Sequence, residues 1–161
     1  MKILGIDPGL GITGYGLIKV SDKRLNVIEA GFIRSDARQN IEKRLSEIYG
    51  KIIRLIKDTH PDIAVIEDIY SHYKHPRTSI LMGHARGVIC LAMEESGVRL
   101  VNYPSTRIKK AITGRGHASK QQIQRTITSL LNLSKIPEPV DITDALALAV
   151  THANVCMHNK I

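Results

Sequence analysis

The first nine residues, Met1 to Gly9, constrain the possible fold more than any other stretch of the chain. The run is almost wholly apolar, is too short for a helix and is stopped by Pro8-Gly9, which predicts a strand buried on both faces. It ends in Asp7, a carboxylate whose burial is costly unless a cation or hydrogen bonds receive it. Asp7 is therefore a candidate site residue, although it could also simply begin an Asp-Pro-Gly turn.

Length and composition indicate one globular domain spanning residues 1–161, with enough chain to bury a core without disulfides or structural metal. No apolar run approaches the length of a membrane span, and the N-terminus has no signal-peptide pattern. We therefore expect a cytoplasmic protein without a membrane partner. Cys90 and Cys156 lie far apart on apolar helical segments, and we expect both to be reduced core residues.

Basic residues are concentrated in one part of the chain. The net charge of +8 indicates an acidic partner, and residues 96–137 contain no Asp or Glu. Arg107, Lys109, Arg115 and Lys120 all fall inside this segment. A solvated surface usually mixes charges of both signs, so a single-signed stretch of this length favours contact with phosphate. Nucleic acid is the expected partner.

The order of predicted elements indicates an α/β fold with a mixed five-stranded sheet flanked by helices. Strands are expected at residues 1–7, 11–20, 25–33, 62–68 and 98–103, and helices at 40–60 and 78–95, after Pro104-Ser105, after Ser119 and from Asp141. Short connections make the first three strands an antiparallel meander. The helix between the third and fourth strands makes the fourth parallel to a meander strand through a right-handed crossover.

The expected helix at 78–95 is apolar over more than one face, so we expect it to be covered on more than one side. Gly83 and Gly87 lie one turn apart and would allow another helix to approach closely. That neighbour belongs either to the same chain or to a second subunit.

Three further carboxylates could join Asp7. Glu67 ends a strand that is predicted to be parallel to the first, and parallel neighbours end at the same edge of a sheet. Asp141 and Asp144 occupy neighbouring positions in the first turn of the last helix, where helix capping is the alternative role for one of them. Clustered carboxylates that offer only oxygen ligands suit hard ions such as Mg²⁺ or Mn²⁺. Two such ions about 4 Å apart can activate water for attack at phosphorus.

Two loops could bind nucleic acid. The segment 69–77 interleaves aromatic and basic residues, among them Tyr70, Lys74 and Arg77, and suits base stacking and phosphate contact; ordinary loop surface is the alternative. Gly114 to Ala118 is a basic loop, after which Ser119 and Gln122 form a capping box that presents Lys120. The match of Gly9 to Gly14 with G-x-G-x-x-G is weak, because these glycines precede a strand rather than a helix.

The chain closely resembles the RuvC family of bacterial Holliday-junction endonucleases. Four motifs carry the resemblance: Ile6-Asp7-Pro8-Gly9, Glu67, Gly114-x-Gly116-x-Ala118-x-Lys120-x-Gln122 and Asp141-x-x-Asp144-Ala145-Leu146-Ala147.

Several expectations follow from the resemblance alone. It implies a ribonuclease H-like fold and a homodimer that resolves four-way junctions in recombination and repair by paired nicks, beside a branch-migration complex of RuvA and RuvB type. It implies that the four acids hold catalytic divalent metal. It also implies that Tyr70 takes the place of an aromatic residue, a Phe in some relatives, that engages bases near the crossover, and that Lys109 and Lys120 handle DNA.

Other functions remain open to the sequence. One is a related RNA- or DNA-processing nuclease that does not resolve junctions. A second is a junction-binding protein without cleavage, against which the four intact acids argue. The third is a small phosphate-loop enzyme that binds nucleotides, suggested only by the glycine match.

Overall fold

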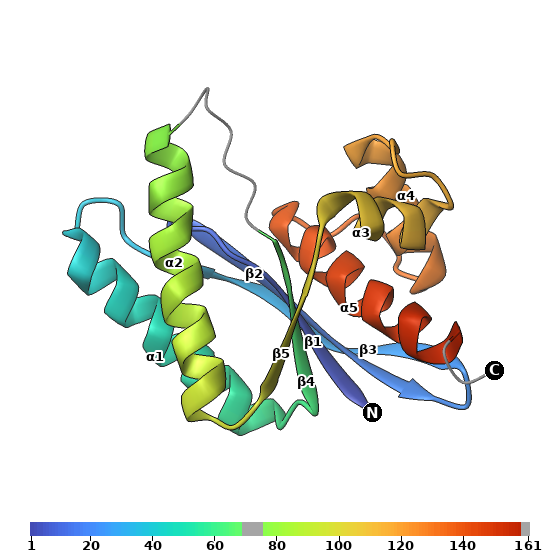
Figure 1. Ribbon diagram of the computed structural model, residues 1–161, viewed down its shortest axis with the longest axis horizontal. Helices are drawn as coiled ribbons and strands as arrows, with labels where there is room; N and C mark the ends of the chain where they lie inside the picture. The colour runs from blue at the N-terminus through green and yellow to red at the C-terminus, as the bar shows by residue number, and fades with distance from the viewer. Residues whose placement is uncertain (69–75, 159–161) are drawn as a thin grey trace.

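A mixed sheet of order β3-β2-β1-β4-β5 lies between two layers of helices (Figure 1). The computed structural model describes residues 1–68 and 76–158. The strands are β1 (Lys2–Asp7), β2 (Ile12–Ser21), β3 (Arg24–Arg34), β4 (Ile63–Glu67) and β5 (Arg99–Tyr103). The meander β1-β2-β3 is antiparallel, while β4 runs parallel to β1 and to β5. The predicted mixed five-stranded sheet is therefore confirmed.

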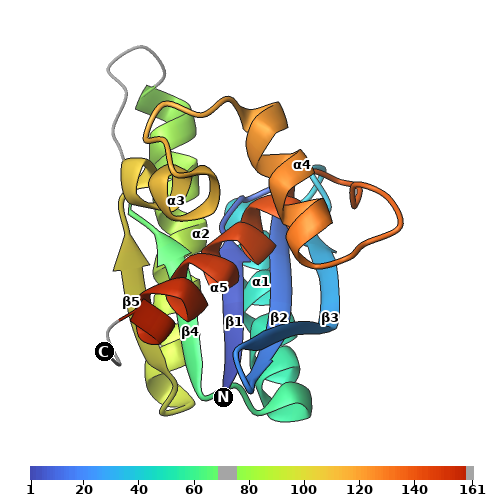
Figure 2. The same ribbon diagram turned by 90° about the vertical axis from the view of Figure 1, so that its right-hand side faces the viewer.

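Five helices in the described part of the chain cover the two faces. They are α1 (Ile41–Thr59), α2 (Pro76–Glu95), α3 (Ser105–Thr113), α4 (Lys120–Leu130) and α5 (Asp141–His158). Asn40 caps α1 by accepting from the Lys43 amide, and the capping box of Ser119 and Gln122 begins α4 as predicted. Helices α1 and α2 lie on one face of the sheet; α5 crosses the other, with α3 and α4 beside it (Figure 2).

Alternation along β1 decides which face receives the candidate acid. Ile3 packs among the side chains of the α5 layer, whereas Leu4 and Ile6 pack in the α1 and α2 layer. Asp7, one residue after Ile6, therefore falls on the α5 side. The same alternation in β4 places Val65 in the α5 layer, and Glu67 follows two residues later. Asp7 and Glu67 thus end neighbouring parallel strands on the same face of the sheet.

Glycine allows α5 to rest directly on the sheet. A Cβ atom at Gly5 would lie 1.9 Å from the carbonyl oxygen of Ala145, and one at Gly14 would lie 2.1 Å from that of Asp141. Helix α5 is buried from Ile142 to Ala153, apart from Asp144, which is half-buried. This close contact places the N-terminus of α5 over the end of β1.

Within residues 1–68 and 76–158 no element of the same chain covers the outer face of α2, where Ile80 is 61% and Leu91 is 51% exposed; coverage by a second subunit stays a prediction. The expectation about the burial of the cysteines is wrong. Cys90 and Cys156 are unpaired, as expected, but half-buried rather than core residues. Cys90 receives a hydrogen bond from Arg86, which lies about one turn earlier on α2. None of the described helices has the length and hydropathy needed to cross a membrane.

The contact between Gly5 and α5 predicts a strong effect of a single methyl group. Gly5→Ala should lower the free energy of unfolding by about 2–3 kcal/mol or more, because the obstructing atom belongs to rigid backbone. Urea unfolding measures this change. Gly11→Ala is the matched control, since no atom lies within 4 Å of the added carbon, and equal stability of the two variants would contradict this account of how α5 is seated.

Candidate active site

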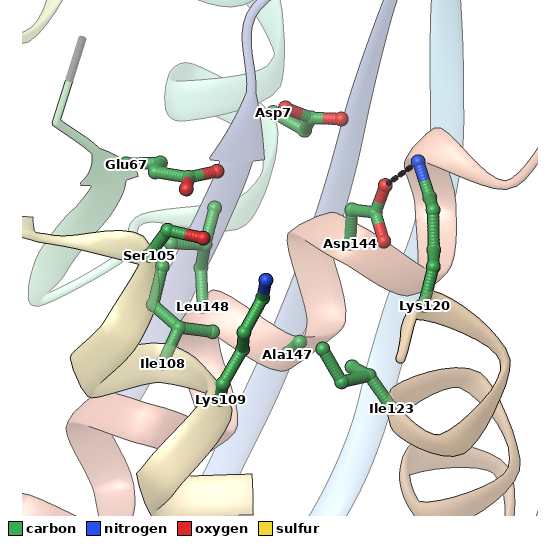
Figure 3. Close-up of a pocket in the computed structure, with 10 residues that line it drawn as sticks. All are labelled: Asp7, Glu67, Ser105, Ile108, Lys109, Lys120, Ile123, Asp144, Ala147 and Leu148. Carbon is green, nitrogen blue, oxygen red and sulfur yellow. Dashed lines mark ion pairs between the residues drawn. The ribbon is translucent and has the colours of Figure 1, made fainter. Parts of the chain in front are cut away.

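A pocket of about 250 Å³ opens where β1 and β4 end, beneath the first turn of α3 (Figure 3). It is lined by Asp7, Glu67, Ser105, Ile108, Lys109, Lys120, Ile123, Asp144, Ala147 and Leu148. Its polar side chains come from β1, β4, α3, α4 and α5, and its apolar wall comes from the three helices. The pocket therefore exists only when both strands and the α3-α4-α5 layer are in place.

The structure brings three of the four predicted acids into this lining. Asp7 comes from β1, Glu67 from β4 and Asp144 from the first turn of α5 (Figure 3). Asp141 is not part of the lining, but it lies close enough for its charge to raise the pKa of Asp7. The spacing of three residues thus leaves one α5 carboxylate in the pocket and the other beside it.

The carboxylates disturb one another electrostatically. The pKa of Asp7 is raised from 3.8 to about 7, chiefly by burial and then by the charges of Asp144, Asp141 and Glu67, in that order. Burial also raises the pKa of Glu67, opposed chiefly by a hydrogen bond from Ser105. Shifts in this direction mean that the folded protein resists holding all of these groups ionised at once. A bound cation would relieve that repulsion.

Two lysines supply part of the missing positive charge. Lys120 Nζ lies 2.8 Å from Asp144 Oδ2, and this hydrogen bond raises the pKa of Lys120 (Figure 3). Lys109 enters the lining from α3, where its charge acts to lower the pKa of Glu67. Neither lysine forms a salt bridge with Asp7 in the described structure.

The donor set fits a hard divalent cation in chemistry and charge. All of the side chains that could serve as ligands offer carboxylate oxygen, which suits Mg²⁺ or Mn²⁺ rather than Zn²⁺. As they stand, no three His, Cys, Asp or Glu side chains in the described ranges are grouped closely enough to hold an ion together. Metal binding would therefore require the carboxylates to draw inward and Asp144 to loosen its contact with Lys120.

The other predicted DNA-binding residues do not line the pocket or lie outside the described part of the chain. Arg77, in the first turn of α2, and Arg115, between α3 and α4, are exposed and do not line the pocket. Tyr70 and Lys74 lie outside the residues that the structure describes. Of the predicted DNA-binding residues, the structure thus places Lys109 and Lys120 beside the carboxylates.

Ser105 is a polar residue of the pocket for which the sequence analysis predicted no role beyond the start of a helix. Its hydroxyl donates a hydrogen bond to the Glu67 carboxylate. The available indication was positional: Pro104-Ser105 directly follows β5, which neighbours the strand that ends in Glu67. That pattern places Ser105 at the same edge of the sheet as the acids.

Comparison with known proteins finds relatives that match most of the chain. The family model described as "Crossover junction endodeoxyribonuclease RuvC" matches residues 3–152. A protein of that name from Rhodopirellula baltica is 47% identical over 148 residues, covering 92% of this chain and 83% of the relative. Another from Thermosipho melanesiensis is 44% identical over 149 residues, covering 92% of this chain and 94% of the relative.

Solved structures show the same fold. Thermus thermophilus RuvC superposes with a TM-score of 0.90 at 26% identity, covering 99% of this chain and 97% of that one. The structure of the same protein in complex with a Holliday junction substrate gives 0.91 at 25% identity, with 99% and 96% covered. The fold is the ribonuclease H-like fold predicted from the sequence.

The raised pKa of Asp7 predicts how stability depends on pH without metal. Between pH 3.8 and about 7 the folded protein holds a proton that the unfolded chain has released, so stability falls as pH rises through this window. Asp7→Asn removes this proton linkage. At pH 8 in EDTA it should raise the free energy of unfolding by about 1–4 kcal/mol, with the difference shrinking toward pH 4.

Urea unfolding at several pH values measures this effect. Asp22→Asn is the control, because Asp22 lies in the turn between β2 and β3, at the opposite end of β2 from Asp7. A wild-type protein whose stability does not fall between pH 4 and 8, or an Asp7→Asn variant less stable than wild type at pH 8, would contradict the repulsion described here.

Proposed function

This chain belongs to the RuvC family of crossover junction endodeoxyribonucleases, and we propose that it resolves four-way DNA junctions in recombination and repair by symmetric paired nicks. The observation that carries the proposal is the convergence of Asp7, Glu67 and Asp144 on one pocket beside two lysines. A junction complex solved for Thermus thermophilus RuvC, which shares the fold over nearly the whole chain, supports the choice of substrate.

The proposed role of the four acids is to hold Mg²⁺, with Mn²⁺ able to replace it and two ions in each site. Bound there, the ions would supply an activated water and stabilise the leaving oxygen of an in-line displacement at phosphorus. Asp7 and Glu67 would hold the ions from the strand ends, and Asp144 with Asp141 from the start of α5. Metal binding would weaken the ion pair of Asp144 with Lys120 and free that ammonium for a DNA phosphate.

Lys109 and Lys120 are proposed to grip the phosphates that flank the cut. Both are in the pocket lining, on the neighbouring helices α3 and α4, so a strand that enters between them would meet an ammonium from each helix. Arg115 and Arg77 would hold backbone farther from the reacting phosphate. For Tyr70 and Lys74 the proposal rests on family resemblance: Tyr70 would stack on a base at the crossover.

A homodimer is proposed to form through the uncovered face of α2. Ile80, Gly83, Gly87 and Leu91 follow one another at helical spacing, and the two glycines leave open space where Cβ atoms would stand. The stripe suits a second copy of the same helix. Two sites related by a two-fold axis would nick opposing strands symmetrically. A cytoplasmic location and a partner complex of RuvA and RuvB type remain family expectations.

Two alternatives lose support from particular residues. The glycines between Gly9 and Gly14 lead into strand β2 at Ile12 and do not open a helix, which disfavours a nucleotide-binding enzyme. The second alternative is a protein that binds junctions without cutting them. In such a protein the repulsion among three acids in one pocket would lower stability without contributing to a reaction, which disfavours this alternative. A nuclease that cuts other branched or hybrid substrates could share this pocket and would differ from a junction resolvase only in substrate specificity.

Cleavage of defined substrates tests the proposed function. Wild-type protein with Mg²⁺ should cut a mobile four-way junction by paired nicks, and should spare linear duplex and an RNA–DNA hybrid. Asp7→Asn should slow nicking more than about a hundredfold, because even outer partners of metal ligands contribute about 10–100-fold. Its junction affinity should persist, since binding depends on phosphate contacts. Equal cutting of all three substrates, or near-normal nicking by the Asp7→Asn variant, would overturn the proposal.

The dimer surface makes a separate prediction. Leu91→Arg should yield a monomer by light scattering and turn paired nicks into single, uncoordinated ones, because a buried unpaired charge disfavours the contact. Ile28→Arg on β3 is the matched control, since Ile28 is 52% exposed and Leu91 is 51% exposed. A Leu91→Arg protein that stays dimeric and nicks both strands together would show that the dimer interface does not include this face of α2.

A further inference from the structure

Glu67 occupies a position that needs external support. It is the last residue of β4, a strand of only five residues. Its pairing with Tyr103 of β5 and the hydrogen bond from the Asp68 amide to the Tyr103 carbonyl, at 3.0 Å, hold the backbone on one side. Two side chains from other elements add to this support.

The first is Ser105, which begins α3. The N-cap of this helix is Pro104, which makes no side-chain capping bond, and its first turn contains no acidic residue. Helix N-termini favour a nearby negative charge, and here Glu67 supplies that charge from the neighbouring strand. Ser105 and Glu67 lie beside each other in the pocket lining (Figure 3), and hydrogen bonding by the Ser105 hydroxyl acts to lower the pKa of the Glu67 carboxylate. One hydroxyl proton engages one carboxylate oxygen, so acceptor sites remain on Glu67 for a cation.

The second is Arg86, which reaches the strand end from α2 on the other layer. Its Nε donates to the Glu67 carbonyl oxygen at 3.4 Å, a long bond, and its Nη2 donates to Asn102 Oδ1 at 2.6 Å. One half-buried guanidinium thus bridges the ends of β4 and β5. The planar fork of arginine suits two simultaneous bonds, which lysine cannot reproduce.

We propose that Ser105 and Arg86 are positioning residues for Glu67: Ser105 fixes the carboxylate and Arg86 fixes the backbone that carries it. The inference rests on the proposed metal-dependent function of the pocket. It separates the acids by role, because Glu67 is held by donors that leave it able to bind a cation, whereas Asp144 is paired with Lys120 and must exchange partners. Glu67 would therefore be the preorganised ligand, around which Asp7 and Asp144 close.

Metal titration without DNA tests the role of Ser105 apart from activity. The melting temperature of the apoprotein is followed as Mg²⁺ or Mn²⁺ is added. Ser105→Ala should raise the metal concentration at the midpoint about tenfold, the typical loss for an outer partner of a metal ligand. Ser105→Thr keeps the hydroxyl and should restore the wild-type midpoint. Thr106→Ala, an exposed residue in the same turn and outside this lining, is the matched control and should have no effect.

Single-turnover nicking on a saturated junction provides the second readout. Ser105→Ala should be slow at low metal concentration and recover toward the wild-type rate as the metal is raised, with junction affinity unchanged. Arg86→Lys should move the metal midpoint in the same direction while retaining the wild-type circular dichroism spectrum. Arg54→Lys, at an exposed arginine on α1 that has no proposed role at the site, controls for loss of a guanidinium.

The outcomes separate this inference from the proposed function. A wild-type protein that neither responds to divalent metal nor cuts junctions would overturn both. A wild-type protein that does both, with an unchanged midpoint for Ser105→Ala, would overturn only the positioning role. An equal loss for Thr106→Ala, or a Ser105→Thr variant as impaired as Ser105→Ala, would also overturn it, because the effect would then come from the helix and not from the hydroxyl.

Discussion

Repulsion among buried carboxylates is the interaction on which the rest of this structure depends. The parallel register of β1 and β4 ends both strands in an acid on the same face of the sheet. Burial and the charges of the neighbouring acids raise the pKa of Asp7, and they act in the same direction on Glu67. The fold tolerates the arrangement through the contact of Lys120 with Asp144, through the charge of Lys109 near Glu67 and through the raised pKa of Asp7, about 7.

The surrounding packing holds the acids where they would otherwise separate. Helix α5 contributes a nearly continuous buried stretch, and its contact with the backbone at Gly5 and Gly14 leaves little room for its N-terminus to retreat. Burial of those side chains offsets the electrostatic cost. The same contact keeps Asp141 and Asp144 over the end of β1. The core beneath the site thus stabilises a cluster of charges that would be unfavourable alone.

Much of this arrangement could be predicted from sequence periodicity. The apolar run before Asp7, the equivalent run before Glu67 and the crossover between them determine the parallel pairing and hence the meeting of two acids. Ser119 marked a helix start because its capping chemistry with Gln122 is local. The roles assigned to Tyr70, Lys109 and Lys120 came from family resemblance and remain predictions.

Contacts between elements were beyond the reach of the sequence. The bonds of Ser105 and Arg86 to Glu67 depend on which side chains the folded sheet edge brings together, and no local spacing encodes them. The apolar surface of α2 was visible in the sequence, but whether the chain itself covers it depends on tertiary packing.

The central claim is that these carboxylates form one divalent-metal centre. Crystals grown with Mn²⁺ and measured at its absorption edge would test it directly, because anomalous scattering locates the ion independently of any assumed ligand. The account predicts a peak between Asp7, Glu67 and Asp144, with Lys120 displaced from Asp144. A well-ordered pocket without such a peak at millimolar Mn²⁺, or a peak only at a site remote from these three side chains, would contradict it.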